Sequence, residues 1–513
     1  MHRQLWGRWI IRASWISLIS LLLAATPVLG QSPALDSNLS ALFPAAGSTG
    51  ICPDTPLRIT FSSPPAYGIS GKIRVFDAAT NQPVETIDIS AKTSTQTIGG
   101  IEDFTYYPVI ISGTNATIYP RNHSLAYGKS YYVTIDPGVF RVGSDWAGLA
   151  GANDWRFSTR LTGPSTRATN LTVAADGSAD FTTVQGAIDF VPINNTAPVT
   201  ILIKKGTYTE IVCIDAKHHL TIRGEDRKGT VITYANNNKL SQKPEMHIYH
   251  RGVFLAYRSD NLWVTNLTIR NTTPQGGSQA ECIILDGNPK ARALLSDLDL
   301  YSFKDTLQMT GEAYVADSYI QGDVDFIWGY GPCFLENCHL YEVRNKAYYT
   351  QVRNPAEHHG YVFHNCLLDG PPDVNQSYLT RVDPVSFPAS EVVFLDCVMG
   401  KTVIPAGWMI SQHKAATQPD AWATVPPDLS NIHFWEFASH DASGNPIDVN
   451  YRLPISRQLK QPQDAATIAN YSNPGWVFDD DWDPTLQLAS NSAPAAVNKQ
   501  AAQPALPAGH TYN

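Results

Sequence analysis

Short segments in which apolar and polar residues alternate run along most of the chain. In the second half, six of these segments open with Asn or Asp, and successive openings are 20 to 31 residues apart. A period of this length is typical of a solenoid, in which each repeat buries its apolar face against its neighbours. The six segments predict an all-β fold with a parallel β-helix, which we place at residues 166–485. They are residues 266–269, 297–300, 317–320, 337–340, 365–368 and 396–399.

A separate group of alternating segments precedes the solenoid. Residues 57–61, 72–76, 131–135 and 155–159 have a period of two and are separated by clusters of Gly, Pro and Asn. Short strands of this kind indicate a small β-sandwich, and these segments resemble bacterial Ig-like modules. We place the module at residues 38–162, before a Pro/Gly/Ser linker, and expect it to act as a spacer or as a carbohydrate-facing accessory.

The two ends of the solenoid carry different signals. Residues 184–191 have the apolar spacing of a short amphipathic helix. A helix at this place would cover the strand edges of the first coil, which otherwise invite aggregation. Residues 486–513 are rich in Ala, Pro, Asn and Gln and show no apolar period, so they predict a disordered tail.

The N-terminus has the pattern of a secretion signal. Arg3, Arg8 and Arg12 supply positive charge before an apolar run at residues 15–25, and small residues precede Gln31. The apolar run is shorter than the roughly 20 residues that a membrane span needs. We therefore predict a signal peptide at residues 1–30 and a secreted protein, extracellular or periplasmic, with no membrane attachment after cleavage.

Composition and charge exclude several classes of partner and cofactor. The net charge of −9 over 513 residues, without clusters of Lys or Arg, argues against nucleic acid. No Cys/His cluster has the spacing of zinc ligands, so we expect neither a metal nor a cofactor. We also expect the protein to be a monomer. Cys338, Cys366 and Cys397 recur at one point of the repeat and are expected to be interior fillers. A disulfide between stacked cysteines is possible but not required.

Two aspartates share a position in consecutive repeats. Asp305 lies eight residues after Asp297, and Asp325 lies eight residues after Asp317. In a solenoid this register puts the pair on adjacent strands, roughly 4.8 Å apart. Two carboxyl groups at that spacing do not both ionise easily, which suits one to act as an acid and the other as a nucleophile. The structural alternative is that both are turn residues of an Asn/Asp ladder; the matched pair favours catalysis.

A set of ordered motifs resembles one known family. The most characteristic is Ile-Gln-Gly-Asp-Val-Asp-Phe-Ile-Trp-Gly at residues 320–329. The chain is similar here to the pectin methylesterases, which are right-handed parallel β-helix enzymes, and the resemblance covers about 300 residues. The supporting motifs are residues 206–210, Gln279-Ala280, residues 305–307, residues 378–381 and Gly407-Trp408.

The resemblance implies a role for each polar residue of these motifs. Asp325 matches the nucleophile, and Asp305 matches the general acid and base. Arg381 matches the arginine that orients the nucleophile and keeps it ionised. Gln279 matches an amide donor to the tetrahedral oxyanion, although a structural amide ladder is the alternative reading. Gln279 and Arg381 are also expected to contact the substrate.

The chain departs from the family at several positions. Lys304 stands where the family usually has Gln, so its ammonium could stabilise the oxyanion, pair with Asp305, or point to solvent. Val382-Asp383 replaces the usual Pro-Trp, which removes an aromatic wall beside the sugar. Trp328 replaces the usual Phe, and we expect Trp328 and Trp408 to bind substrate.

The expected reaction is hydrolysis of the methyl esters of galacturonan, which gives pectate and methanol. The expected partner is methyl-esterified pectin or another plant cell-wall polysaccharide. Motifs of polygalacturonases, of pectate lyases and of serine esterases with G-x-S-x-G do not occur in the solenoid. Two alternatives stay open: a related β-helix esterase or thioesterase with another acyl substrate, and a non-catalytic polysaccharide-binding solenoid.

Overall fold

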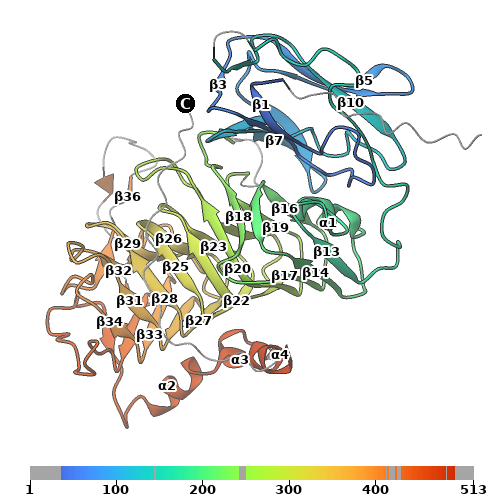
Figure 1. Cartoon of the computed structure of the whole chain (residues 1–513). Coiled ribbons are helices and arrows are strands. Elements are labelled where there is room, and N and C mark those ends of the chain that lie inside the picture. Colours follow the sequence, from blue (N-terminus) through green and yellow to red (C-terminus); the bar gives the residue numbers. More distant parts are fainter. Residues whose placement is uncertain are drawn as a thin grey trace, which may run out of the picture. The chain divides into compact units, whose positions relative to one another are not determined.

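The computed structural model describes residues 36–143, 146–241, 250–411, 413–414, 422–423, 429–480 and 482–491 (Figure 1). All of them belong to a single unit of the chain. The signal peptide predicted at residues 1–30 lies outside the described residues, as does the predicted tail beyond residue 491. The predicted start of the tail at residue 486 is wrong, because residues 486–491 belong to helix α4 (Pro484–Asn491). Its Leu488 packs against an apolar cluster, which gives this segment a reason to fold.

The first part of the described chain is an antiparallel β-sandwich, as predicted. Two four-stranded sheets, in the orders β1-β2-β9-β8 and β12-β10-β4-β5, share one apolar core that contains Ile59, Val75, Val133 and Trp155. There are two further antiparallel pairs: β6-β7 is a hairpin of consecutive strands, and β11-β3 joins strands that are far apart in the sequence. The strands are β1 (Leu39–Phe43), β2 (Leu57–Phe61), β3 (Ala66–Tyr67), β4 (Lys72–Asp77), β5 (Gln82–Asp88), β6 (Ser94–Ile98), β7 (Ile101–Tyr106), β8 (Val109–Ser112), β9 (Asn115–Ile118), β10 (Ser130–Ile135), β11 (Phe140–Arg141) and β12 (Arg156–Ser158).

The second part is a parallel β-helix whose coils contribute strands to three walls, named A, B and C (Figure 1). Wall A contains β13 (Asn170–Val173), β14 (Val199–Ile203), β17 (Leu220–Gly224), the first halves of β20 (Leu262–Asn271) and β22 (Arg292–Tyr301), β24 (Glu312–Ala316), β27 (Cys333–Glu336), β30 (Tyr361–His364), β33 (Glu391–Leu395), β38 (His433–Phe437) and β39 (Arg457–Gln458). Wall B contains β15 (Gly206–Thr209), β18 (Thr230–Tyr234), the second halves of β20 and β22, β25 (Tyr319–Gly322), β28 (His339–Glu342), β31 (Leu367–Asp369) and β34 (Val398–Met399). Wall C contains β16 (Val212–Asp215), β19 (Phe254–Tyr257), β21 (Ile283–Asp286), β23 (Leu307–Met309), β26 (Val324–Gly329), β29 (Tyr348–Val352), β32 (Tyr378–Val382) and β35 (Trp408–Ile410). A short hairpin, β36 (His413–Lys414) and β37 (Trp422–Ala423), follows wall C.

The repeated Asn and Asp residues of the sequence mark the bends between walls A and B. All six have a positive φ, between 50° and 56°. This left-handed conformation is costly for most residues, but Asn and Asp tolerate it because their short polar side chains bond locally. The repeat seen in the sequence therefore arises because one such bend occurs in each coil. The six residues are Asn266, Asp297, Asp317, Asn337, Asn365 and Asp396.

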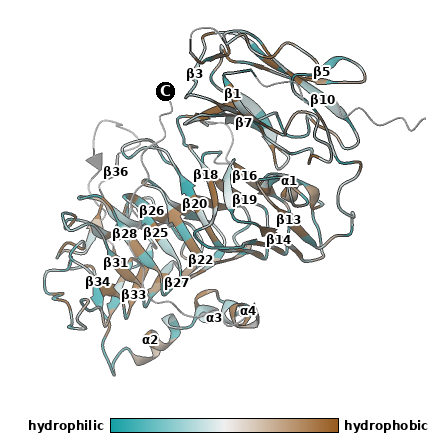
Figure 2. Ribbon diagram, in the orientation of Figure 1, coloured by the Kyte–Doolittle hydropathy of each residue, from teal (hydrophilic) through white to brown (hydrophobic). Residues whose placement is uncertain are grey.

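Apolar side chains from the three walls fill the interior of the β-helix. Hydrophobic and hydrophilic residues alternate along its strands (Figure 2). Cys338, Cys366 and Cys397 are buried in this interior as free thiols, as are Cys213, Cys282 and Cys333. Cys52, before strand β2, is also a buried free thiol but lies outside this cluster. The stacked cysteines therefore serve as small interior fillers in this structure.

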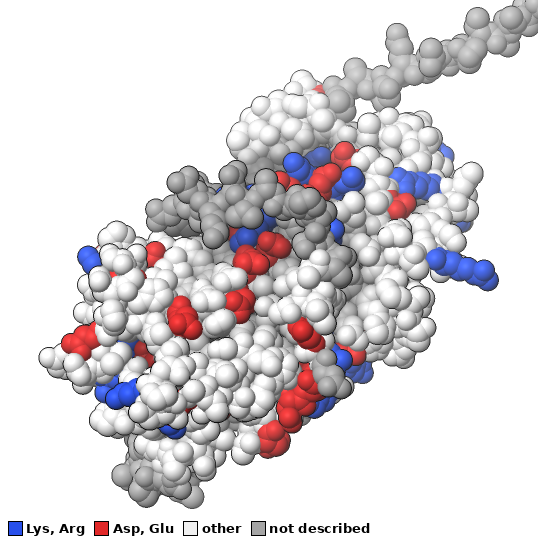
Figure 3. All heavy atoms as spheres, turned by 90° about the horizontal axis from the view of Figure 1, so that it is seen from below, with Lys and Arg blue, Asp and Glu red and all other residues white. Residues whose placement is uncertain are grey.

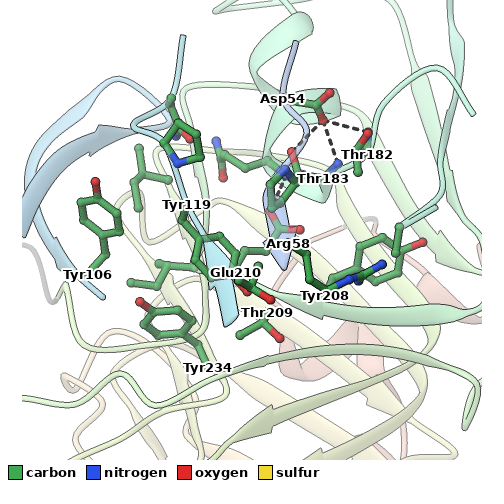
Figure 4. Close-up of a pocket in the computed structure, with 18 of the residues that line it drawn as sticks. Asp54, Arg58, Tyr106, Tyr119, Thr182, Thr183, Tyr208, Thr209, Glu210 and Tyr234 are labelled. Atoms are coloured by element: carbon green, nitrogen blue, oxygen red, sulfur yellow. Dashed lines mark hydrogen bonds between the residues drawn. The ribbon is translucent and has the colours of Figure 1, made fainter. Parts of the chain in front are cut away.

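Helix α1 (Val184–Phe190) covers the first coil, as predicted, and two half-buried carboxylates bind its N-terminal end. Asp54 of the sandwich accepts hydrogen bonds from the backbone N–H groups of Thr182 and Thr183 at 2.9 and 2.7 Å. Glu210 accepts from the N–H groups of Val184 and Gln185, both at 2.9 Å. Burial raises the pKa of Glu210 to about 7. Both carboxylates line a cavity of about 180 Å³ between the sandwich and the first coils (Figure 4).

The sandwich also contributes directly to the core of the β-helix. Ile98, Ile101, Phe104 and Tyr106, from the β6–β7 pair, belong to the same apolar cluster as the coils. The hydroxyl of Tyr234 accepts a hydrogen bond from the N–H of Tyr107 at 2.8 Å. The expected spacer is thus joined to the solenoid by packed side chains as well as by the linker.

Acidic and basic side chains are interspersed on the face shown in Figure 3 rather than gathered by sign. None of the helices within the described residues is both long and apolar enough to span a membrane.

Three short helices near the C-terminus pack on the outer face of wall A (Figure 1). They are α2 (Ala465–Tyr471), α3 (Pro474–Val477) and α4. A buried carboxylate, Glu391, joins them to the coils: it bonds Nδ1 of His359 at 2.9 Å, Nδ1 of His433 at 2.7 Å and the hydroxyl of Tyr471 at 2.6 Å. Burial alone would raise the pKa of Glu391, but these bonds outweigh it and lower the pKa to about 2.

We predict that Glu391→Gln destabilises the protein above pH 4.5. A carboxyl group with a lowered pKa stabilises the fold above its unfolded pKa of 4.5, and this contribution disappears as the pH falls towards 2. At about 1.4 kcal/mol per pKa unit, the free energy of unfolding at pH 7 should fall by up to about 3 kcal/mol. Thermal unfolding at pH 7 and at pH 3 measures the difference, which should shrink at the lower pH. Glu357→Gln, at an exposed neighbour, is the matched control and should change little.

Candidate active site

A row of three carboxyl groups crosses consecutive coils at the start of wall C. The ladder pairs Leu307 of β23 with Ile283 of β21 and with Ile327 of β26. An acidic residue lies two positions before each of these three ladder residues, so the three acids lie side by side. The ladder extends this far, because the N–H of Asp305 donates to the carbonyl of Val324 at 3.2 Å. All three are buried. The acids are Glu281, Asp305 and Asp325.

Asp325 forms a bidentate ion pair with Arg381 of β32, two coils further along. Nε of Arg381 donates to Oδ1 at 2.9 Å, and Nη2 donates to Oδ2. The guanidinium also lies 4.7 Å from the ring centre of Tyr348. Burial raises the pKa of Asp325, and the hydrogen bonds and charge of Arg381 oppose that rise. The paired geometry favours the ionised carboxylate, with one face directed by the arginine fork.

Asp305 has no bidentate arginine partner. Burial raises its pKa well above the ordinary value, and the charges of Glu281 and Asp325 raise it further. Arg251 and Lys304 oppose this rise, but the nearest guanidinium atom of Arg251 is 3.4 Å from Oδ2 of Asp305. Asp305 also has φ of 65° and Asp325 has φ of 50°, so both stand in left-handed turns outside the A–B bends.

The structure places Lys304 close to these acids. It is half-buried, and its positive charge lowers the pKa values of Asp305, Asp325 and Glu281. Gln279 is also half-buried and lies one coil away, where the N–H of the adjacent Ala280 donates to the carbonyl of Lys304 at 3.1 Å.

The two tryptophans predicted to bind substrate lie in different surroundings. Trp328 is 3% exposed, and the guanidinium groups of Arg353 and Arg251 lie 4.7 and 5.8 Å from its ring centre. Its ring therefore contacts arginines beside the acids and leaves little surface for a sugar.

Trp408 is a correction to the sequence-based prediction. It is 1% exposed, stacks on Phe434 at 4.7 Å, and donates its indole N–H to Glu436 at 3.1 Å. A side chain inside the coil core does not contact a polysaccharide, so we remove it from the binding residues. Asp383, which replaces the usual Trp, accepts bonds from Val385 and Ser386 and shapes a local turn.

Sequence reasoning missed three charged residues of the site. Glu281 carried a usable signal, since it precedes Asp305 by the same coil register by which Asp305 precedes Asp325. Arg251 and Arg353 carried none, because both lie outside the strands, in segments whose path depends on the fold. Arg353 also lowers the pKa of Asp325 through its charge.

The arrangement suits nucleophilic attack by one carboxylate with proton transfer by the other. Asp325 has an arginine counterion, whereas Asp305 has every reason to keep its proton. Among the described residues, no group of three or more His, Cys, Asp or Glu could hold a metal ion.

Comparison with known proteins relates the two parts of the chain to two families. The family model described as Pectinesterase matches residues 170–421, and the model described as Bacterial Ig-like domain matches residues 36–159. Pectinesterase 31 of Arabidopsis thaliana is 30% identical over 245 residues, which make up 46% of this chain and 75% of that protein. Pectinesterase 2 of Olea europaea is 30% identical over 281 residues, or 51% of this chain and 69% of that protein.

A solved structure, the pectin methylesterase from carrot, has the same fold. Its TM-score is 0.52 at 20% identity, and the match covers 63% of this chain and 98% of that chain. The parallel β-helix predicted from the repeat is thereby confirmed.

We predict that Asp305→Asn stabilises the protein at neutral and alkaline pH. A carboxyl group with a raised pKa favours the fold while it is protonated, and that advantage is lost as the pH rises through its folded-state pKa. Asn mimics the protonated group and does not ionise. Thermal unfolding at pH 8 and pH 4 should show a higher Tm for the variant at pH 8 and a smaller difference at pH 4. If the Tm difference between Asp305→Asn and wild type were the same at pH 8 and at pH 4, the raised pKa of Asp305 would be contradicted.

Proposed function

Because the chain belongs to the pectinesterase family, we propose that it hydrolyses the methyl esters of galacturonan, producing pectate and methanol. The observation that carries the proposal is the pair of buried aspartates on adjacent coils: Asp325 is held by Arg381, and Asp305 lies between two other carboxyl groups, Glu281 and Asp325. Ester hydrolysis through an aspartyl intermediate needs an ionised carboxylate as nucleophile and a protonated carboxyl group as acid within reach of one carbonyl.

In the first step, an Oδ atom of Asp325 attacks the ester carbonyl carbon. The tetrahedral oxyanion receives hydrogen bonds from Gln279 and Lys304, a type of contribution worth about 3 kcal/mol per donor. The carbon–methoxy bond then breaks, and Asp305 gives its proton to the departing oxygen. Methanol leaves, and a mixed anhydride joins Asp325 to the galacturonate carboxyl.

In the second step, water attacks the galacturonate carbonyl of this anhydride. Asp305, now a carboxylate, takes a proton from the water. The bond to Asp325 breaks, which frees the galacturonate and restores the Asp325 carboxylate and the Asp305 acid. Arg381 stabilises Asp325 as nucleophile and as leaving group, because its fork stays on the same carboxylate throughout.

The same proposal includes export and a monomeric enzyme. Pectin is an extracellular polymer of plant cell walls, and the N-terminal residues 1–30 have the charge and apolar pattern of a signal peptide.

We predict that Asp325→Asn abolishes methanol release from highly methylated pectin by several orders of magnitude. The amide keeps the shape of the side chain but is not a nucleophile. Asp317→Asn is the matched control, since the same substitution in the same coil falls at a bend where other coils already carry Asn. The control should keep its activity. Methanol release by Asp325→Asn close to that of wild type would refute the assignment of the nucleophile.

Lys304 allows a second test. Lys304→Gln should retain most of the activity, because an amide also donates to the oxyanion, whereas Lys304→Ala should lose roughly 10²–10³-fold in kcat. Loss of the ammonium also removes a charge that lowers the pKa of Asp305. The alkaline limb of kcat/KM, which reports the general acid, should therefore move to higher pH in Lys304→Gln. An Ala variant with wild-type kcat would leave Gln279 as the principal side-chain donor.

A further inference from the structure

Behind Asp305 lies a buried ion pair that the reaction steps above do not use. Nε of Arg251 donates to both carboxylate oxygens of Glu281, at 2.9 and 3.0 Å, and Nη2 donates to Oε1 at 2.7 Å. Glu281 is 0% exposed and Arg251 is 7% exposed. The same Nη2 lies 3.4 Å from Oδ2 of Asp305. One guanidinium therefore contacts two carboxyl groups, and it is closer to Glu281.

We infer that Arg251 and Glu281 are positioning residues for the general acid: Glu281 keeps Arg251 from becoming the counterion of Asp305. This inference rests on the proposed function, in which Asp305 must hold a proton. A buried ion pair is a weak source of stability, since apolar replacements are often as stable. Its contact with a reactive carboxyl gives it a more specific role.

The charges around Asp305 explain why Glu281 matters. Two negative groups, Glu281 and Asp325, face it, and three positive groups, Arg251, Lys304 and Arg381, also act on it. Arg381 is committed to Asp325 by its bidentate contact. Arg251 is committed to Glu281 in the same way. With both guanidinium groups paired elsewhere, burial and the negative neighbours keep Asp305 protonated.

Two buried asparagines hold the backbone on both sides of the ion pair. The side-chain amide of Asn236 donates to the carbonyls of His250 and Gly252, at 2.6 and 2.8 Å, on either side of Arg251. The side-chain amide of Asn271 donates to the carbonyls of Asn236 and Glu281, at 2.6 and 3.0 Å. The positions of Arg251 and Glu281 are thus coupled through one hydrogen-bond chain.

A strand of the sandwich also packs against this arrangement. Phe104 of β7 stacks on the ring of His250, with ring centres 4.3 Å apart and planes 20° apart. His250 is 1% exposed and directly precedes Arg251. A side chain of the Ig-like module therefore packs one residue away from the arginine that contacts Asp305. The module acts in this way as a support of the active site.

The pH dependence of kcat/KM on methylated pectin tests the positioning role. In Glu281→Gln, Arg251 becomes free to pair with Asp305, so the alkaline limb should move down by about 1–3 pH units. The double variant Arg251→Gln/Glu281→Gln removes both charges and should return the limb towards its wild-type position. A purely structural role would make the double variant no better than the single one.

A readout without substrate separates this test from that of the proposed function. The stability gain of Asp305→Asn grows with pH from the unfolded-state pKa of Asp305 up to its folded-state pKa. In the Glu281→Gln background this gain should be smaller, and should level off at a lower pH, than in the wild-type background. If the wild-type enzyme releases no methanol from pectin, the proposed function fails while this shift still reports on Asp305. The inference would be overturned if Glu281→Gln left unchanged both the alkaline limb of kcat/KM and the pH dependence of the stability gain from Asp305→Asn.

Phe104→Ala tests the support from the module. Loss of the stacked ring should move the alkaline limb, because Arg251 is then held less firmly against Glu281. Phe140→Ala, at an equally buried Phe of the sandwich core, is the control. It should lower the Tm and leave the limb in place. Identical pH profiles for Phe104→Ala and Phe140→Ala would remove the module from the inference.

Discussion

The stacking of parallel strands at a single spacing is the constraint on which the rest of this molecule depends. Each coil repeats the register of the coil before it, so any residue type at one register position forms a row roughly 4.8 Å apart per step. Apolar rows become the core, and rows of Asn and Asp become the bends between walls A and B. The same rule forces Glu281, Asp305 and Asp325 together, because their positions in consecutive coils match.

Three buried acids in a row are unstable unless their charges are distributed. The structure solves this with two guanidinium groups that each take one acid at an end of the row, Arg251 with Glu281 and Arg381 with Asp325. The central acid, Asp305, has no close bidentate partner, so its protonated form is favoured. The difference between nucleophile and acid thus arises from which aspartate has a close arginine partner, since Asp305 and Asp325 are both buried and both have a positive φ.

Much of this could be predicted from the sequence, for physical reasons that also explain the failures. The solenoid followed from the period of bends that Asn and Asp tolerate, and the aspartate pair followed from the same register. The placement of Arg251 did not follow, because its side chain reaches Asp305 from a turn whose path depends on Asn236 and Asn271. The Gly-Trp motif predicts that Trp408 binds substrate, but Trp408 is buried in the coil core, where its N–H donates to Glu436.

The Ig-like module shows that a linker in the sequence does not mean that the two parts it joins are structurally independent. Composition shows a Pro/Gly/Ser segment near residue 163, which favours separable parts. Packing shows that the β6–β7 pair places Ile98, Ile101 and Phe104 in the coil core, and that Asp54 binds the backbone at the start of α1. An apolar side chain buried across a junction binds the two parts whatever the length of the connection. Because Phe104 packs on the residue next to Arg251, the junction and the charge pattern of the active site are parts of one arrangement.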